Sequence, residues 1–83
     1  MSYLVSAAPQ LGATLRGMRK LRRMTQHDVA HASGLRQKTV SLLETEPHRC
    51  SVDSLMRYLS AVRVNISLEV KADGTSIGNK GVW

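Results

Sequence analysis

Apolar residues recur at helical spacing near the start of the chain. Leu11, Leu15 and Met18 give one apolar side to a helix that we expect from about Pro9 to Arg22. Proline is favoured in the first turn of a helix, and basic residues are favoured in the last turn, so both ends of this segment fit. The pattern therefore predicts a first helix that packs through its leucine side.

Thr25 begins a second helical segment, because Thr25-x-x-Asp28 has the pattern of a capping box. The helix is expected to end at about Ala32, with Val29 and Ala30 facing inward. A capping residue, an acid in the first turn and an inward apolar pair together predict a short helix.

Gly34 ends this helix and begins a turn to a third one. The turn requires a left-handed backbone conformation, which glycine adopts at little cost. We expect the third helix from about Gln37 to Glu44, with Val40 and Leu43 inward. Pro47 ends the helical run and predicts a loop after it.

Ser51 is a favoured N-cap and Asp53 suits a first turn, so a fourth helix is expected after Ser51. Its apolar stripe has helical spacing and comprises Val52, Leu55, Met56, Leu59 and Val62.

From residue 64 the period of the apolar residues falls to two. A β-strand is predicted over residues 64–71, with its apolar side formed by Val64, Ile66, Leu68 and Val70. A lone strand leaves its backbone groups unpaired, so it needs a partner strand. One partner would be a local hairpin through Asp73-Gly74. We favour the same strand of a second copy, paired antiparallel, because the hairpin's return arm has one strongly apolar residue.

The charge of the chain is concentrated in one region. Its 83 residues carry a net charge of +6, which favours a polyanionic partner such as nucleic acid. Between residues 16 and 38 there is one acid, Asp28, and the basic residues are Arg16, Arg19, Lys20, Arg22, Arg23, Arg36 and Lys38. Basic and acidic residues balance over the rest, so the first half should carry the positive surface.

Other features of the composition indicate a soluble cytoplasmic protein. Cys50 is the only cysteine, which excludes an internal disulfide and suits a reducing compartment. The first residues lack the pattern of a secretory signal, and no apolar run approaches the length of a membrane span. A core this small is marginal, and oligomerisation is a common remedy.

Two short helices joined by a glycine turn form the helix-turn-helix arrangement. Residues 21–44 resemble the lambda-repressor/Cro-like helix-turn-helix regulators. The matching positions are Thr25, Gln26, Ala30, Gly34, Gln37, Thr39, Val40, Ser41 and Glu44. The resemblance covers residues 9–62 and implies a mainly α fold of four to five short helices, here followed by the C-terminal strand. It also implies a structural ion pair between Arg19 and Glu44.

Within that family, the chain is similar to the HipB-type antitoxins. The similarity lies in its small size, the strand directly after the last helix, and the tail that ends in Trp83. It implies a homodimer that represses its own operon and binds a HipA-like serine/threonine kinase toxin. Trp83 is the expected contact to that toxin, because exposed aromatic residues often anchor partners.

The second motif helix is expected in the major groove of DNA, where its first residues reach base edges. The candidate base-contacting residues are Arg36, Gln37, Lys38, Ser41 and Leu42. Leu42 either contacts a thymine methyl group or packs within the protein. The candidate phosphate-contacting residues are Gln26, Thr39, Arg22, Arg23 and Arg49.

Nothing in the sequence indicates an enzyme or a cofactor. His27 and His31 flank Asp28 as in a metalloprotease motif, but the acid is shorter than the usual glutamate and the histidines lie opposite the inward pair. Surface histidines explain them better than a metal site does. Cys50 has no expected base beside it and is interpreted as an inert thiol.

These expectations divide the chain into four parts: an N-terminal arm (1–8), a DNA-binding domain (9–63), a dimerising strand (64–71) and a tail (72–83). The leading hypothesis is an autoregulating repressor and antitoxin. The alternatives are a stand-alone phage or chromosomal repressor without a toxin, and a protein-interaction adaptor without DNA binding.

Overall fold

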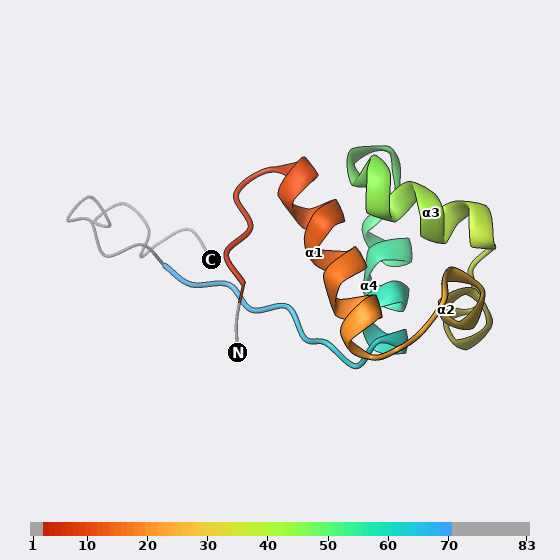
Figure 1. Ribbon diagram of the computed structural model, residues 1–83. Coiled ribbons are helices and arrows are strands. Elements are labelled where there is room, and N and C mark those ends of the chain that lie inside the picture. The colour runs from red at the N-terminus through yellow and green to blue at the C-terminus, as the bar shows by residue number, and fades with distance from the viewer. Residues whose placement is uncertain (1–2, 71–83) are drawn as a thin grey trace.

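Five helical elements follow one another in the computed structural model, which describes residues 3–70 (Figure 1). They are α1 (Ala8–Leu21), α2 (Gln26–Ser33), α3 (Gln37–Thr45), the 3-10 helix η1 (Pro47–Arg49) and α4 (Val52–Ala61). The mainly helical fold predicted from the sequence is confirmed. In place of the plain loop expected after Pro47, the chain makes one short 3-10 turn.

The ends of the short helices are fixed by the residues that the sequence pattern indicated. The Thr25 hydroxyl accepts a hydrogen bond from the Asp28 backbone N–H at 3.0 Å, and the Asp28 carboxylate accepts one from the Thr25 N–H at 2.8 Å. The hydrogen bonds that the Asp28 carboxylate accepts from Thr25, first from its backbone N–H, lower the pKa of Asp28. Gly34 follows α2 with a φ of 76°, in the left-handed region. Ser51 caps α4 by accepting from the Ser54 N–H at 3.0 Å.

The core lies where α1, α3 and α4 meet α2. Its buried side chains are Leu15, Val29, Val40, Leu43, Tyr58, Leu59 and Val62. Tyr58 was missing from the predicted core, although it is completely buried. Conversely, Val52 and Met56 belong to the predicted stripe of α4 but are 73% and 47% exposed. The apolar stripe of α4 is therefore wider than the surface that one chain covers.

Residues 64–70 follow α4: Val64 still packs against the core, and the segment then runs out beyond the helices (Figure 1). Within residues 3–70 of this single chain they form neither helix nor strand, so the expected pairing with a second copy stays a prediction. Ile66, Leu68 and Val70 are 52%, 91% and 73% exposed. Lys71, the alternative hairpin at Asp73-Gly74 and the tail with Trp83 lie outside the described residues. No helix in the described part of the chain is long and apolar enough to cross a membrane.

Candidate nucleic-acid interface

Helix α3 has one buried side and one side that faces out. Val40, Leu43 and Glu44 are buried, and they fix which way the helix turns its remaining residues. Gln37 and Lys38 are exposed at the start of the helix, and Ser41 follows one turn later, partly exposed. These three residues therefore lie away from the buried side of α3, and their expected contact with bases stays a prediction.

The remaining base-contact candidates lie at the edges of this side. Arg36 is exposed and is the N-cap residue of α3, although its side chain makes no capping bond. Leu42 is half-buried, so neither of its two expected roles is favoured by exposure alone. Thr39, a phosphate candidate, is also half-buried, and its backbone N–H donates to the Arg36 carbonyl at 3.0 Å.

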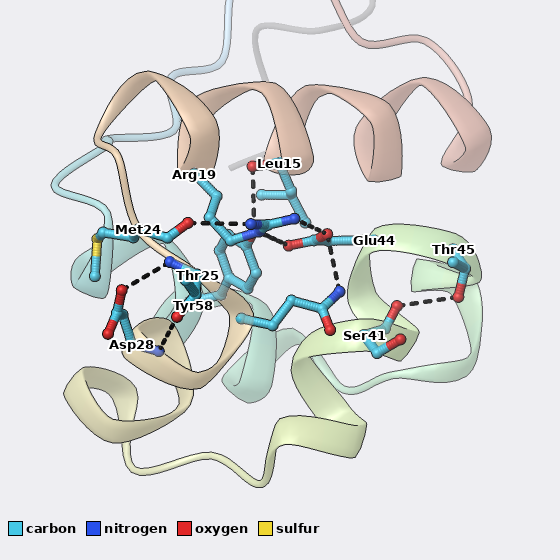
Figure 2. A network of polar contacts seen from close by, with 10 residues as sticks. Leu15, Arg19, Met24, Thr25, Asp28, Ser41, Glu44, Thr45 and Tyr58 are labelled. Atoms are coloured by element: carbon cyan, nitrogen blue, oxygen red, sulfur yellow. Dashed lines mark hydrogen bonds and ion pairs between the residues drawn. The ribbon is translucent and has the colours of Figure 1, made fainter.

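A buried carboxylate joins all four α-helices (Figure 2). Arg19 of α1 donates from Nε to Oε2 of Glu44 at 2.7 Å and from Nη2 to Oε1 at 3.1 Å. Tyr58 of α4 makes a 2.5 Å hydrogen bond to Oε2 and lies 3.1 Å from the Leu15 carbonyl oxygen. Gln26 of α2 donates to Oε1 at 3.2 Å. The expected contact between Arg19 and Glu44 is present, and it is part of this larger cluster.

The cluster shifts the pKa values of its members. Burial raises the pKa of Glu44, but the hydrogen bonds from Arg19, Tyr58 and Gln26, with the charge of Arg19, outweigh burial and leave that pKa below its ordinary value. Burial and the Glu44 carboxylate raise the pKa of Tyr58 far above its ordinary value. Glu44 is therefore charged and Tyr58 neutral at neutral pH.

Gln26 and Tyr58 are the two members of this cluster that sequence reasoning did not include. Gln26 was expected at a phosphate, which stays a prediction; in the structure it is the first residue of α2. Its bond to Glu44 was not foreseen, because the two residues are 18 positions apart. The Tyr58 position could have been found, since it lies one helical turn from Leu55 and Val62 on the inward side of α4.

Arg22 points to the end of α4. Its Nε donates to the Val62 carbonyl oxygen at 3.0 Å, and its Nη2 donates to the Arg63 carbonyl oxygen at 3.2 Å. Arginine is well suited to binding the free carbonyl groups at a helix end. Arg22 thus ties the end of α1 to the end of α4, a role that the phosphate expectation did not include.

The other two basic phosphate candidates are exposed. Arg23 follows α1 with a φ of 57°, so its backbone is in the left-handed region. Arg49 lies in η1, and its Nη1 is 3.5 Å from the Glu46 carboxylate in an exposed pair. Exposed pairs of this kind are weak and leave the arginine available to another anion.

The histidines and the cysteine do not form a reactive group. His27 and His31 are exposed on α2. Among residues 3–70, no three His, Cys, Asp or Glu side chains gather where they could hold a metal ion. Cys50 is half-buried, and burial raises the pKa of its thiol, which lowers its reactivity.

The structure has the features of a helix-turn-helix domain. Its two motif helices are the capped α2 and an α3 with a polar outward side; they are joined by a glycine turn and pack on α1 and α4. Residues 14–67 match the Cro/C1-type helix-turn-helix DNA-binding domain, and the chain belongs to that family. No curated protein matches the sequence closely enough to count as a relative.

Solved structures of HipB share this fold. One is a HipB–O4 20mer complex, with 21% identity, a TM-score of 0.79, and coverage of 87% of this chain and 100% of that one. Another is a HipA–HipB–O2–O3 complex, with 20% identity, a TM-score of 0.78, and coverage of 83% and 97%. A complex of a HipB variant with an O2 20mer has 20% identity, a TM-score of 0.79, and coverage of 88% and 100%. The expected likeness to HipB-type chains is thereby confirmed for the fold.

Proposed function

We propose that this chain is a transcriptional repressor that binds a palindromic operator as a homodimer. One observation carries the proposal: α3 of a Cro/C1-type domain turns Gln37 and Lys38 outward, at the positive part of the chain. The N-terminal residues of such a helix read base edges in the major groove. Glutamine pairs with adenine and lysine with guanine, each worth about 1–3 kcal/mol of discrimination. A repressor of this kind works at the nucleoid.

The contacts divide into two groups. The base-reading group is Arg36, Gln37, Lys38, Ser41 and Leu42, and the phosphate-binding group is Gln26, Thr39, Arg22, Arg23 and Arg49. Arg22 donates from Nε and Nη2 to the carbonyl groups at the end of α4. It would therefore bind a phosphate only through the guanidinium N–H groups that these two bonds do not use.

The test separates base reading from charge. The full chain selects its preferred duplex from a random pool, and binding is then measured by fluorescence anisotropy against salt. Gln37→Ala should weaken the selected duplex about 5- to 150-fold, as expected for 1–3 kcal/mol, without changing the salt slope. Arg23→Ala should weaken every duplex and lower the slope by about 0.9 per phosphate lost.

A matched control is Arg16→Ala, which removes an exposed charge from α1 rather than from the motif. If Gln37→Ala binds its selected duplex as tightly as the unchanged chain does, the groove assignment is wrong. If the unchanged chain retains no DNA at low salt, the adaptor alternative replaces the repressor.

The homodimer would form through residues 64–71. Ile66, Leu68 and Val70 are exposed in the single chain, and a groove of about 300 Å³ beside them is lined by Met56, Leu59, Ser60, Val64, Asn65 and Ile66. A second copy that pairs its strand here would cover both the exposed side chains and the groove.

Ile66→Lys or Leu68→Lys should give monomers in analytical ultracentrifugation, and Ser67→Lys is the control on the opposite side of the strand. Dimers that persist in both apolar variants would exclude this interface.

The finer part of the proposal is an antitoxin role. The likeness to HipB and the existence of a HipA–HipB complex with this fold support it. Trp83 would be the contact to a HipA-like kinase. The chain should be co-expressed with an adjacent kinase-like reading frame, if the source genome has one, with Trp83→Ala alongside.

The antitoxin hypothesis predicts that the chain relieves the growth arrest caused by that kinase and that the Trp83→Ala variant relieves it less. A chain that binds its operator but has no effect on the kinase would be a stand-alone repressor. The division of labour proposed is thus an arm (1–8), a DNA-binding domain (9–63), a dimerising strand (64–71) and a partner-binding tail (72–83).

A further inference from the structure

Two glutamines occupy the same place in the two motif helices. Gln26 is the first residue of α2, and Gln37 is the first residue of α3. The Gln26 Nε2 donates to the Glu44 carboxylate at 3.2 Å. The Gln37 side-chain amide makes no hydrogen bond to any residue in the described range 3–70. One amide is therefore held before any ligand arrives, and the other can still turn.

The carboxylate that holds Gln26 is itself fixed. Its side chain is 2% exposed, and each of its oxygens has two donors within hydrogen-bond distance: Arg19 and Gln26 at Oε1, Arg19 and Tyr58 at Oε2. Four donors use the acceptor capacity of a carboxylate. Glu44 cannot turn away from Gln26 without leaving buried polar groups unpaired, which is costly.

The chemistry of the pair also fixes which way the Gln26 amide faces. An ionised carboxylate only accepts hydrogen bonds, so the amide nitrogen, not the amide oxygen, must point to Glu44. That nitrogen carries a second N–H, which points away from Glu44. Gln26 is the first residue of α2, and the Thr25 cap takes the Asp28 N–H and not those of Gln26 and His27, which helix geometry leaves without a partner inside the helix.

We propose that Glu44 is a positioning residue for DNA binding, which orients the Gln26 amide so that its second N–H meets a phosphate oxygen together with the start of α2. The inference rests on the proposed function, in which Gln26 binds a phosphate. Gln26 is then a preset anchor that fixes the register of the domain on the backbone. Gln37 is an adaptable reader that orders only when its base is present.

Ordering a long side chain at an interface weakens binding by about twofold to tenfold. The Glu44 contact removes this factor for Gln26 in each half-site. Glu44→Gln should restore it, because the glutamine replaces one carboxylate oxygen by an NH2 group that only donates. The one remaining acceptor oxygen cannot hold the four donors from Arg19, Gln26 and Tyr58 that the carboxylate holds.

The first arm of the test uses the free full chain and no variant. In ¹⁵N relaxation, the Gln26 side-chain amide should show an order parameter close to that of rigid backbone, about 0.85, and the Gln37 amide one below about 0.6. Equal mobility of the two amides would overturn the inference and leave the proposed function untouched. This arm holds even if Glu44→Gln fails to fold.

The second arm is ethylation interference on the selected duplex. Gln26→Ala should lose interference at one phosphate position per half-site, and Glu44→Gln should weaken interference at that same position. Tyr58→Phe is the matched control: it also removes a donor to Glu44 but leaves the bond to Gln26, so it should keep that phosphate. If Glu44→Gln weakens all phosphates evenly, or Tyr58→Phe loses the same one, Glu44 acts only on stability and the inference fails. If the unchanged chain retains no duplex, the proposed function itself fails.

Discussion

The backbone of Gly12 in α1 lies directly against the carbonyl group of Glu44 in α3. A Cβ at position 12 would stand 2.6 Å from the Glu44 carbonyl oxygen and 3.4 Å from Cδ of Pro47. The obstacle is mainly backbone, which cannot move aside as a flexible side chain would. This close approach allows Arg19, two turns along α1, to reach the Glu44 carboxylate at 2.7 Å.

Gly12→Ala should therefore destabilise the domain, in spite of the higher helix propensity of alanine. Overpacking of this kind costs about 1–3 kcal/mol. The matched control is Gly17→Ala in the same helix, where an added Cβ has no heavy atom within 4 Å. That change should stabilise the domain by up to about 1 kcal/mol. Urea unfolding followed by circular dichroism measures both, and a stability gain in both variants would contradict the close contact.

Two arginines have a left-handed backbone conformation that glycine would adopt with less strain. Arg23 and Arg63 follow α1 and α4 with φ values of 57° and 59°. Arg63→Gly should raise the free energy of unfolding by up to about 1 kcal/mol, because glycine adopts this conformation without steric cost. Arg23→Gly should give a similar gain in stability but should weaken DNA binding, since Arg23 is a proposed phosphate contact. Thermal unfolding and salt-dependent binding measure the two effects, and a loss of stability in Arg63→Gly would contradict the strain.

The bond between Arg22 and the end of α4 predicts a loss of stability when the guanidinium is removed. Arg22→Met keeps most of the aliphatic stem but leaves the carbonyl groups of Val62 and Arg63 without this donor. Two part-exposed hydrogen bonds are worth about 1–3 kcal/mol together. Arg16→Met, at an exposed position of the same helix, is the control. Denaturant unfolding should separate the two variants, and equal stability would mean that the Arg22 bonds contribute nothing.

Local signals in the sequence were enough to predict most of the fold. Thr25, Gly34 and Ser51 act on their own backbone or on residues three or four positions away, so their roles can be read without a tertiary structure. The helices they delimit were predicted within a residue or two. The burial of Val29, Val40 and Leu43 also followed from helical periodicity.

Contacts between distant residues were harder to predict. The bond from Gln26 to Glu44 and the bonds from Arg22 to the end of α4 depend on how the helices cross, which periodicity does not contain. Tyr58 was overlooked because tyrosine is amphipathic and so is not a certain core residue by its type. Its ring is buried, and its hydroxyl donates a hydrogen bond to Glu44. The outward side of α3 could be predicted, because Gln37, Lys38 and Ser41 are what remains when the apolar positions turn inward.

The lowered pKa of Glu44 predicts how the stability of the domain depends on acid. In the folded chain the pKa of the Glu44 carboxyl lies below its ordinary value of 4.5. This carboxyl therefore binds a proton more tightly in the unfolded chain than in the folded one. The stabilisation from ionised Glu44 is therefore complete above the unfolded pKa. It is lost as the pH falls from about 4.5 through the lower folded pKa.

Glu44→Gln lacks this titration, so its stability deficit relative to the unchanged chain should be largest at neutral pH and should shrink as the pH falls below 4.5. Urea unfolding of both chains between pH 7 and pH 3 measures the difference. Glu46→Gln, which neutralises an exposed acid paired with Arg49, is the control for a general effect of charge on this basic chain. A deficit for Glu44→Gln that stays constant over the whole range would show that the buried carboxylate does not stabilise the domain through its charge.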